Sequence, residues 1–330
     1  MPELTSADAV RIESFLSEPS QRRLANDVLD GLTRPFKELP PKHFYDARGS
    51  QLFELICELP EYYPARTEMQ ILSERAEEIV AVTGCGELVE LGCGATDKAR
   101  ILLDAMTEAG TLRRYIPLDV SESVIREAAA QLVRDYDGLR VHGMVGDFER
   151  HLDRLPSHDG VPRLVALLGG TIGNFPPGSR RTLLRTIGAM LGPDDRLLLG
   201  TDLVKDPATI EAAYNDSRGV TAEFNRNVLH VINRELDADF VPDHFDHVSF
   251  FDHRHEWIEM RLRARDACTV MIADLDLEVE FAADEELRTE ISAKFTPARL
   301  EADYAGSGLR LDGWFVDPGS LFALSLAARV

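Results

Sequence analysis

Short apolar runs alternate with amphipathic stretches along most of the chain from about residue 86. Apolar runs bounded by polar residues predict buried strands, whereas apolar residues that recur every three or four positions predict helices. Their alternation is typical of a parallel sheet flanked by helices. Strands are predicted at 87–91, 114–120, 140–146, 163–169 and 196–202. Helices are predicted between them at 97–106, 121–133 and 179–191, with N-caps at Ser121 and Ser179.

The pattern changes after Asp202. Residues 207–238 have helical spacing, and two longer segments with strand patterning follow at 247–265 and 268–282. The chain then ends with a helix at 297–304 and strands at 310–316 and 321–329. We therefore interpret residues 205–294 as an insertion, and we expect the first 66 residues, mostly helical, to pack against it. The prediction is an α/β fold of two domains, one formed by 67–204 and 295–330 and a second, α+β domain formed by 14–66 and 205–294.

The composition narrows the class of function. The chain has 330 residues, 44% of them hydrophobic, which is enough for a core that supports two domains. No apolar run reaches the roughly 20 residues of a membrane helix, and the first residues lack the features of a secretory signal. The four cysteines are scattered, so reduced thiols in a cytoplasmic protein are expected. The formal net charge of −21 argues against a nucleic-acid partner, because phosphate binding depends on lysine and arginine. We expect a monomer that acts on a small molecule.

A glycine motif, VELGCGATDK, follows the first predicted strand of the sheet at residues 89–98. Gly92 and Gly94 allow a tight turn and a close approach of the backbone to a ligand. A dinucleotide-binding loop needs a third glycine three residues later, where this chain has Asp97. An acidic residue there disfavours a pyrophosphate, which binds at a bare helix N-terminus. S-adenosylmethionine has no phosphate and is compatible with this loop.

Acidic residues end the next two strands at the positions that this cofactor requires. Asp119 ends RYIPLDV, where a carboxylate can accept both ribose hydroxyls, and Asp147 with Phe148 ends VGDF, where they can meet the adenine amino group and ring. A carboxylate at the end of a strand is also a common turn or capping residue. Lys98 either contacts the cofactor or lies on an exposed helix face. Three signals in order on successive strands together favour S-adenosylmethionine.

Six segments resemble a known family, the histidine Nα-methyltransferases of the ergothioneine pathway. The resemblance runs from about residue 20 to the C-terminus, and its most specific stretches are residues 39–68, 169–175, 200–206, 219–229, 258–264 and 289–295. It implies a Rossmann-like class I methyltransferase sheet with a second, substrate-binding domain. The implied reaction transfers three methyl groups from S-adenosylmethionine to the α-amino group of L-histidine and gives Nα,Nα,Nα-trimethyl-L-histidine (hercynine).

The resemblance also implies roles for individual residues. Asn174 and Tyr214 match residues that hold the substrate carboxylate, and both carry the hydrogen-bond donors that a carboxylate requires. Glu290 and Ser292 match the pair that reads the imidazole, and their alternate spacing on a strand puts both on one face. The remaining substrate positions are Tyr62 lining the histidine site, Gly169 beside the amino group and Met260 against the ring. The implied cofactor contacts are Gly92, Lys98, Asp119, Asp147 and Phe148.

The amine must lose a proton before it attacks the methyl group. Tyr45 resembles a tyrosine placed near the amine and is a candidate for accepting or relaying that proton. A phenol with an ordinary pKa near 10 is a poor base at neutral pH, so deprotonation by solvent before binding is an equal alternative.

Other functions fit parts of the same sequence pattern. A methyltransferase for another amino acid or amine is disfavoured by the Glu290 and Ser292 pair, and an NAD-dependent oxidoreductase by the missing third glycine. A small-molecule sensor without turnover would keep the same residues. Residues 243–256 hold four histidines, of which His253 and His255 alternate on one predicted strand face. A solvated hairpin is the favoured interpretation there, and no metal is expected.

Overall fold

The computed structural model describes residues 9–16 and 20–330. The chain divides into two compact units. Of the described residues, the first unit comprises 9–16, 66–203 and 295–330, and the second comprises 20–65 and 204–294. In the described part of the chain no helix has both the length and the apolar character needed to cross a membrane.

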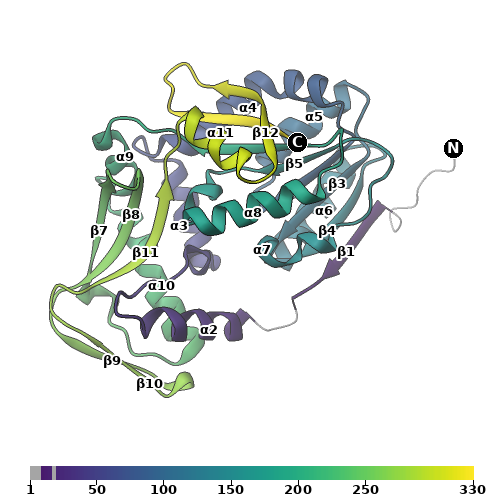
Figure 1. Cartoon of the computed structure of the whole chain (residues 1–330). Helices are drawn as coiled ribbons and strands as arrows, with labels where there is room; N and C mark the ends of the chain where they lie inside the picture. Colours follow the sequence, from purple (N-terminus) through teal and green to yellow (C-terminus); the bar gives the residue numbers. More distant parts are fainter. Residues whose placement is uncertain (1–8, 17–19) are drawn as a thin grey trace. The chain divides into compact units, whose positions relative to one another are not determined.

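The first unit is built on one mixed sheet (Figure 1). Across the described residues its strands lie in the order β1-β4-β3-β2-β5-β6-β13-β12. Strands β1 to β6 run parallel, whereas β13 is antiparallel to both of its neighbours. All the strands predicted for this domain are present, and the Rossmann-like sheet is confirmed. Their bounds are β2 Glu87–Leu91, β3 Arg114–Asp119, β4 Arg140–Val145, β5 Arg163–Leu167, β6 Arg196–Asp202, β12 Leu309–Val316 and β13 Phe322–Arg329.

Helices α4 (Tyr63–Thr83), α5 (Asp97–Glu108) and α6 (Glu122–Asp135) cover this sheet. Their buried apolar residues join those of the strands in one cluster, which includes Ile71, Leu72, Ile79, Leu102, Met106, Leu132, Leu88, Leu164, Leu198 and Leu324. Ser121 caps α6 as predicted, because its hydroxyl accepts from the Val124 amide. The prediction of Ser179 as an N-cap is wrong. Helix α8 (Pro177–Met190) begins earlier, since proline is favoured in the first turn and Pro176 occupies the cap position.

A strand that the sequence did not predict lies at one edge of the sheet. β1 (Val10–Ser14) pairs in parallel with β4, so residues expected to be helical contribute to the first unit instead. Shorter helices and turns complete this unit: α7 Phe148–His151, η2 Leu152–Arg154, η3 Thr171–Asn174 and α11 Pro297–Ala305. Helix α11 packs on α8 and β12.

The second unit combines a three-stranded antiparallel sheet, β11-β8-β7, with a separate hairpin of β9 and β10. Each of the two long strands predicted at 247–265 and 268–282 is in fact a pair of strands with a turn between them. No glycine or proline marks either turn, and positive backbone φ values at Glu256 and Asp276 accommodate the reversal instead. The bounds are β7 Phe245–Asp252, β8 Trp257–Ala264, β9 Cys268–Ile272, η5 Ala273–Leu275, β10 Leu277–Phe281 and β11 Glu286–Ala293.

Helix α10 (Val220–Leu236) is the central helix of the second unit. It contacts α2 (Ser20–Leu32), η1 (Pro41–Phe44), α3 (Ala47–Cys57), η4 (Pro242–His244), and strands β7 and β8. Its buried face carries Phe224, Val228, Leu229 and Ile232, as its amphipathic pattern predicts. The helical segment predicted at 207–238 is interrupted, because α9 (Pro207–Tyr214) ends before Gly219 adopts a left-handed conformation.

A β-bulge in β11 decides which side chains face the interior. The register between β11 and β8 shifts between Arg288 and Glu290, which leaves Thr289 as an extra residue. Before the shift Arg288 pairs with Arg261, and after it Glu290 pairs with Met260. Directly paired residues lie on the same face of a sheet. The bulge therefore turns Glu290, and Ser292 two residues later, to the face that carries Met260.

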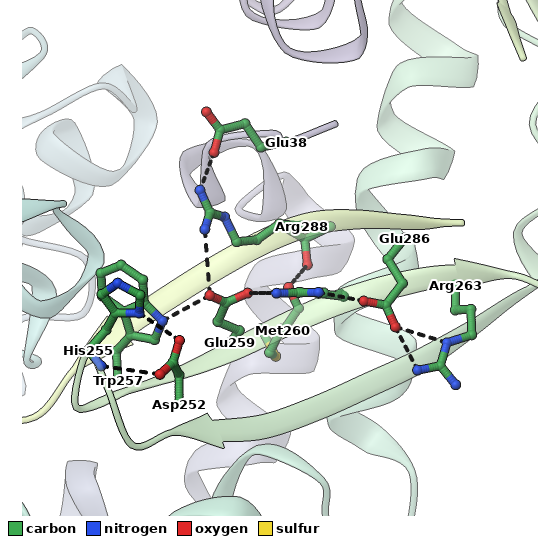
Figure 2. Close-up of polar contacts among 11 residues, drawn as sticks. Glu38, Asp252, His255, Trp257, Glu259, Met260, Arg263, Glu286 and Arg288 are labelled. Carbon is green, nitrogen blue, oxygen red and sulfur yellow. Dashed lines mark hydrogen bonds and ion pairs between the residues drawn. The ribbon is translucent and has the colours of Figure 1, made fainter. Parts of the chain in front are cut away.

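The opposite face of this sheet carries a row of ion pairs. Figure 2 shows it running from Glu38 through Arg288 and Glu259 toward Glu286 and Arg263. Arg261 joins the two halves, since its guanidinium lies 2.5 Å from carboxylates of both Glu259 and Glu286. Alternating charges on neighbouring strands give each group an opposite partner on this polar face.

Candidate active site

The glycine loop of the first unit follows β2 and turns back over the sheet. Gly92 has a φ of +75°, and its amide donates to the Leu118 carbonyl at 2.8 Å. A Cβ at this position would lie 3.7 Å from the ring of Phe148, so the loop and that ring are neighbours. Gly92 and Gly94 are both exposed. The loop thus offers bare backbone at the carboxyl end of the central strands, where ligands of this sheet type bind.

Asp119 lies at the end of β3 and faces the glycine loop. One carboxylate oxygen accepts from the Ser121 amide at 2.9 Å, and the other accepts from the Gly94 amide at 3.4 Å. The Cys93 thiol is buried beside it, 3.9 Å from the same oxygen, and burial raises the pKa of that thiol. A carboxylate has about four acceptor positions, and the two amides and the thiol use three of those on Asp119, so one stays available for a further donor.

Asp147 and Phe148 begin the short helix α7 at the end of β4. Asp147 caps the helix, accepting from the Glu149 amide at 2.9 Å, and both residues are partly exposed. Phe148 packs edge-on against Phe175 at 6.3 Å between ring centroids. The structure therefore brings together Gly92, Asp119 and Phe148 at one edge of the sheet, as the sequence predicted.

A buried carboxylate that the sequence analysis did not single out links two predicted site residues. Glu68, in α4, is fully buried and accepts from the Lys98 ammonium at 2.5 Å and from the Gly169 amide at 2.8 Å. Gly169 has a φ of +75°, in the loop after β5. A Cβ at Gly200 would come within 2.1 Å of the Glu68 carboxylate, so a glycine there leaves room for it. The detectable signal was a charged residue four positions before Leu72, on the apolar face of its helix.

Asn174 lies in the same loop as Gly169. It ends the single turn η3, is partly exposed and belongs to the first unit. Gly169 and Asn174 are thus the predicted substrate residues that the first unit carries, and the others belong to the second unit.

Aromatic side chains of the second unit form a continuous row. Tyr45 contacts Phe53 at 5.5 Å, Phe53 contacts Tyr62 at 6.0 Å, and Tyr62 contacts Tyr214 at 6.3 Å, all edge-to-face. Phe224 packs against both Tyr45 and Phe53. The structure therefore brings the three predicted tyrosines together through Phe53 and Phe224, which the sequence analysis did not select.

Tyr45 is exposed to solvent over 48% of its surface, and its ring packs against Phe53 and Phe224. Burial raises the pKa of this phenol, and the nearby Glu290 carboxylate raises it further. The phenol therefore stays protonated at neutral pH.

Tyr214, Ser292 and Lys294 form a buried triangle. The Tyr214 hydroxyl donates to the Ser292 Oγ at 3.0 Å. The Lys294 ammonium donates to both oxygens, at 3.1 Å and 3.0 Å. The first two residues were predicted from the sequence. Lys294, which lies two residues after Ser292, was not.

Glu290 occupies the same face as Ser292 and Met260 because of the bulge at Thr289. Burial raises the pKa of its carboxyl to about 7, and the Lys294 ammonium acts in the opposite direction. Among the described residues no donor lies within hydrogen-bond distance of this carboxylate. Glu290 is therefore an acceptor directed at whatever binds beside it.

A buried polar network supports these groups from behind. The Thr289 hydroxyl donates to the Asn225 side chain at 2.6 Å, and the Asn225 amide in turn lies 2.9 Å from His247 Nδ1. The other nitrogen of His247 lies 2.9 Å from the Tyr214 carbonyl. Burial lowers the pKa of His247, so the ring is neutral and can accept from Asn225 while donating to Tyr214. The network connects the bulge to the end of α9.

The histidine-rich stretch at 243–256 differs from its predicted geometry. His253 and His255 lie in the turn between β7 and β8 and not on a strand face. His255 stacks on Trp257 at 4.4 Å and pairs with Asp252 at 2.6 Å (Figure 2). Within residues 9–16 and 20–330 no group of three or more histidines, cysteines and acids is arranged to hold a metal ion.

Comparison with known proteins gives matches over nearly the whole chain. A family model described as "Histidine-specific methyltransferase, SAM-dependent" matches residues 24–329. The histidine N-alpha-methyltransferase of Mycolicibacterium smegmatis is 53% identical over 313 residues, covering 95% of this chain and 97% of that protein. The protein of the same description from Mycobacterium tuberculosis is 48% identical over 306 residues, covering 93% and 95%. Ergothioneine biosynthesis protein 1 of Neurospora crassa is 36% identical over 200 residues, 60% of this chain and 23% of that protein.

Proposed function

Because the chain belongs to the family of histidine-specific, S-adenosylmethionine-dependent methyltransferases, we propose that it methylates the α-amino group of L-histidine. Three successive transfers to this nitrogen give hercynine, on the route to ergothioneine. The family predicted from the six sequence segments is confirmed by the match, and with it the methyl donor, S-adenosylmethionine. We also propose three transfers in succession and a role for each of the site residues described below.

The observation that carries the assignment of substrate is the placement of Glu290 and Ser292. Both lie on the Met260 face of the second sheet, and Ser292 is hydrogen-bonded to Tyr214. A carboxylate and a hydroxyl beside an apolar side chain suit a small ring that is flat, apolar on its faces and polar at its edge. An imidazole ring has these properties, whereas an indole or a phenyl ring leaves the carboxylate buried and unpaired, which discriminates strongly.

The loops at the ends of β2, β3 and β4 fit S-adenosylmethionine. Gly92 offers exposed backbone, Asp119 has an acceptor position for a ribose hydroxyl, and Phe148 presents a ring beside the loop. Lys98, held by Glu68, would pair with the carboxylate of the methionine part. When bound, the cofactor supplies an electrophilic methyl group on a sulfonium. The protein's part is to position the amine in line with it, which can supply much of the acceleration.

Proton removal from the amine is assigned to solvent. The raised pKa of Tyr45 keeps its phenol protonated, so it serves as a hydrogen-bond partner of the amine, directly or through water, and not as the final proton acceptor. Of the two alternatives drawn from the sequence, this favours deprotonation before binding.

We also propose that the enzyme works as a monomer in the cytoplasm. None of the four cysteines forms a disulfide. Cysteines that are not paired in disulfides suit a reducing compartment. Light scattering of the purified protein checks the oligomeric state.

The decisive experiment is mass spectrometry of the purified protein incubated with S-adenosylmethionine and each of the twenty amino acids separately. We expect a trimethylated product from histidine alone. Methylation of a different amino acid would keep the cofactor assignment and overturn the substrate. Absence of product from every amino acid, with cofactor binding intact, would point to a larger substrate or to a sensor.

A further inference from the structure

Lys294 is a fully buried lysine at the end of β11. Its ammonium lies within 3.1 Å of the Tyr214 and Ser292 hydroxyl oxygens and 4.7 Å from the centre of the Tyr214 ring. Burying an ammonium is costly unless polar groups or aromatic faces surround it. Lys294 therefore places a charge at a buried position where an apolar side chain would cost less free energy to bury.

The hydrogen bonds among Tyr214, Ser292 and Lys294 determine whether the Ser292 hydroxyl can donate to a ligand or accept from it. An ammonium can only donate, so both hydroxyl oxygens accept from Lys294. Ser292 Oγ also accepts from the Tyr214 hydroxyl at 3.0 Å. A hydroxyl oxygen has two lone pairs, and both are then engaged. What Ser292 can still offer a ligand is its own proton.

Glu290 offers the opposite. As a carboxylate it only accepts, and it faces the same side of β11 as Ser292. Resting on the proposed function, we propose that Lys294 is a positioning residue that makes Ser292 a donor, so that Ser292 and Glu290 together select a ring with one bare nitrogen and one N–H. Neutral imidazole is such a ring. An imidazolium, with two N–H groups, leaves the Ser292 proton without an acceptor.

Lys294 also acts on the charge of Glu290. Among the described residues, this carboxylate interacts electrostatically with Lys294 from the end of β11, Tyr45 from the turn after η1, and Tyr62 from the loop before α4. Both tyrosines have raised pKa values and are neutral. Lys294 is thus the group that favours the ionised, accepting form of Glu290. Its removal moves the ionisation of Glu290 to higher pH.

Two substitutions separate the hydrogen bonds from the charge. Lys294→Met removes both, whereas Lys294→Gln removes the charge and keeps an N–H donor. We compare kcat/KM for histidine with that for thienylalanine, whose ring has neither a bare nitrogen nor an N–H. A change in the binding of the part that the two amino acids share affects both substrates, so the ratio between them isolates the recognition of the ring.

For Lys294→Met we expect the preference for histidine over thienylalanine to fall roughly tenfold or more, since a misdirected polar group is costly. The acidic limb of kcat/KM for histidine moves to higher pH, because Glu290 loses the ammonium that favours its ionised form. Lys294→Gln also shifts the acidic limb of kcat/KM, but it keeps more of the preference for histidine over thienylalanine than Lys294→Met does. In a Ser292→Ala background, Lys294→Met no longer changes the preference, which is the coupling expected of residues in one network.

Lys205→Met is the matched control, because Lys205 donates to a tyrosine hydroxyl, Tyr63 at 2.7 Å, in the same unit. It leaves both the preference and the pH limb as in the wild type. Equal loss for both substrates in both Lys294 variants, with the limb unmoved, would overturn the inference and leave Lys294 a structural residue. Failure of the proposed function looks different, because the wild-type protein itself would then give no methylated histidine.

Discussion

Buried charges define the chemistry of this protein at the scale of single residues. Glu68 and Lys294 are fully buried and Glu290 is partly buried, and each contacts or faces a residue predicted from the sequence to bind a ligand. Glu68 and Lys294 have partners that hold them in place, whereas Glu290 presents its carboxylate without a donor among the described residues. We therefore assign Glu68 and Lys294 to positioning neighbouring residues, and Glu290 to recognising the ligand.

The role of Tyr45 has a direct test. We expect Tyr45→Phe to reduce kcat less than about tenfold, because a true general base contributes roughly 10²–10⁴-fold. The pH dependence of kcat keeps its shape, since the raised pKa of Tyr45 already prevents ionisation in the working range. Steady-state kinetics across pH check this. A fall of more than a hundredfold with a lost ionisation would assign the proton to Tyr45.

Glu290 should cost stability when it is ionised. Its folded-state pKa of about 7 lies above the ordinary value of 4.5. The stability linked to its protonation is therefore present below pH 4.5 and lost as pH rises through about 7. The Glu290→Gln side chain cannot ionise. The free energy of unfolding of this variant, relative to that of wild type, should therefore increase by about 2 kcal/mol from pH 5 to pH 8. Urea unfolding at both pH values measures it, and a difference independent of pH would contradict the assignment.

At the scale of an element, the β-bulge of β11 determines which residues can recognise a ligand. Without the extra residue at Thr289, the alternation would carry Glu290 and Ser292 to the face of the Arg–Glu row in Figure 2. Thr289 is held by Asn225 and by the Met260 carbonyl at 3.0 Å. The polar network thus fixes the register of a strand as well as the position of Tyr214.

Thr289→Val removes the hydroxyl and keeps the shape. We expect a loss of about 1–3 kcal/mol in stability, since Asn225 loses its donor, together with weaker binding of histidine. Thr201→Val is the matched control, because Thr201 is also buried and donates to a carbonyl, Ala323, in the first unit. It should lower stability with histidine affinity intact. Calorimetry on both variants separates the effects, and unchanged affinity in Thr289→Val would refute the role of the bulge.

At the scale of the whole molecule, the acidic composition lowers the stability of the folded state. A formal net charge of −21 gives mutual repulsion that favours expansion, and salt screens it. We therefore expect Tm to rise by a few degrees between about 0.01 M and 0.5 M sodium chloride. Differential scanning calorimetry checks this, and a Tm that falls with salt would show that local ion pairs such as Arg261–Glu259 outweigh the repulsion.

Patterns within short stretches predicted the sheet and its helices because burial and periodicity are local there. They did not predict β1, whose alternation of Arg11 and Glu13 with apolar residues becomes a strand only through β4, far along the chain. They missed the turn after β7, because His253 and His255 continue the alternation without a glycine or proline. Family segments led to Glu290 and Ser292. Glu68 and Lys294 needed the structure, since a charge at a buried position acquires meaning only from its partners.

The position of β13 has a consequence for how the chain is made. This strand comes last in the sequence, yet it lies between β6 and β12 and is buried along almost its whole length. A chain emerging from the ribosome therefore cannot complete its main sheet until residues 322–329 have been made. Until then β6 presents an unpaired edge, on which another nascent chain could pair. Premature termination a few residues before Phe322 would leave a product with that edge permanently open, and we expect such a product to aggregate.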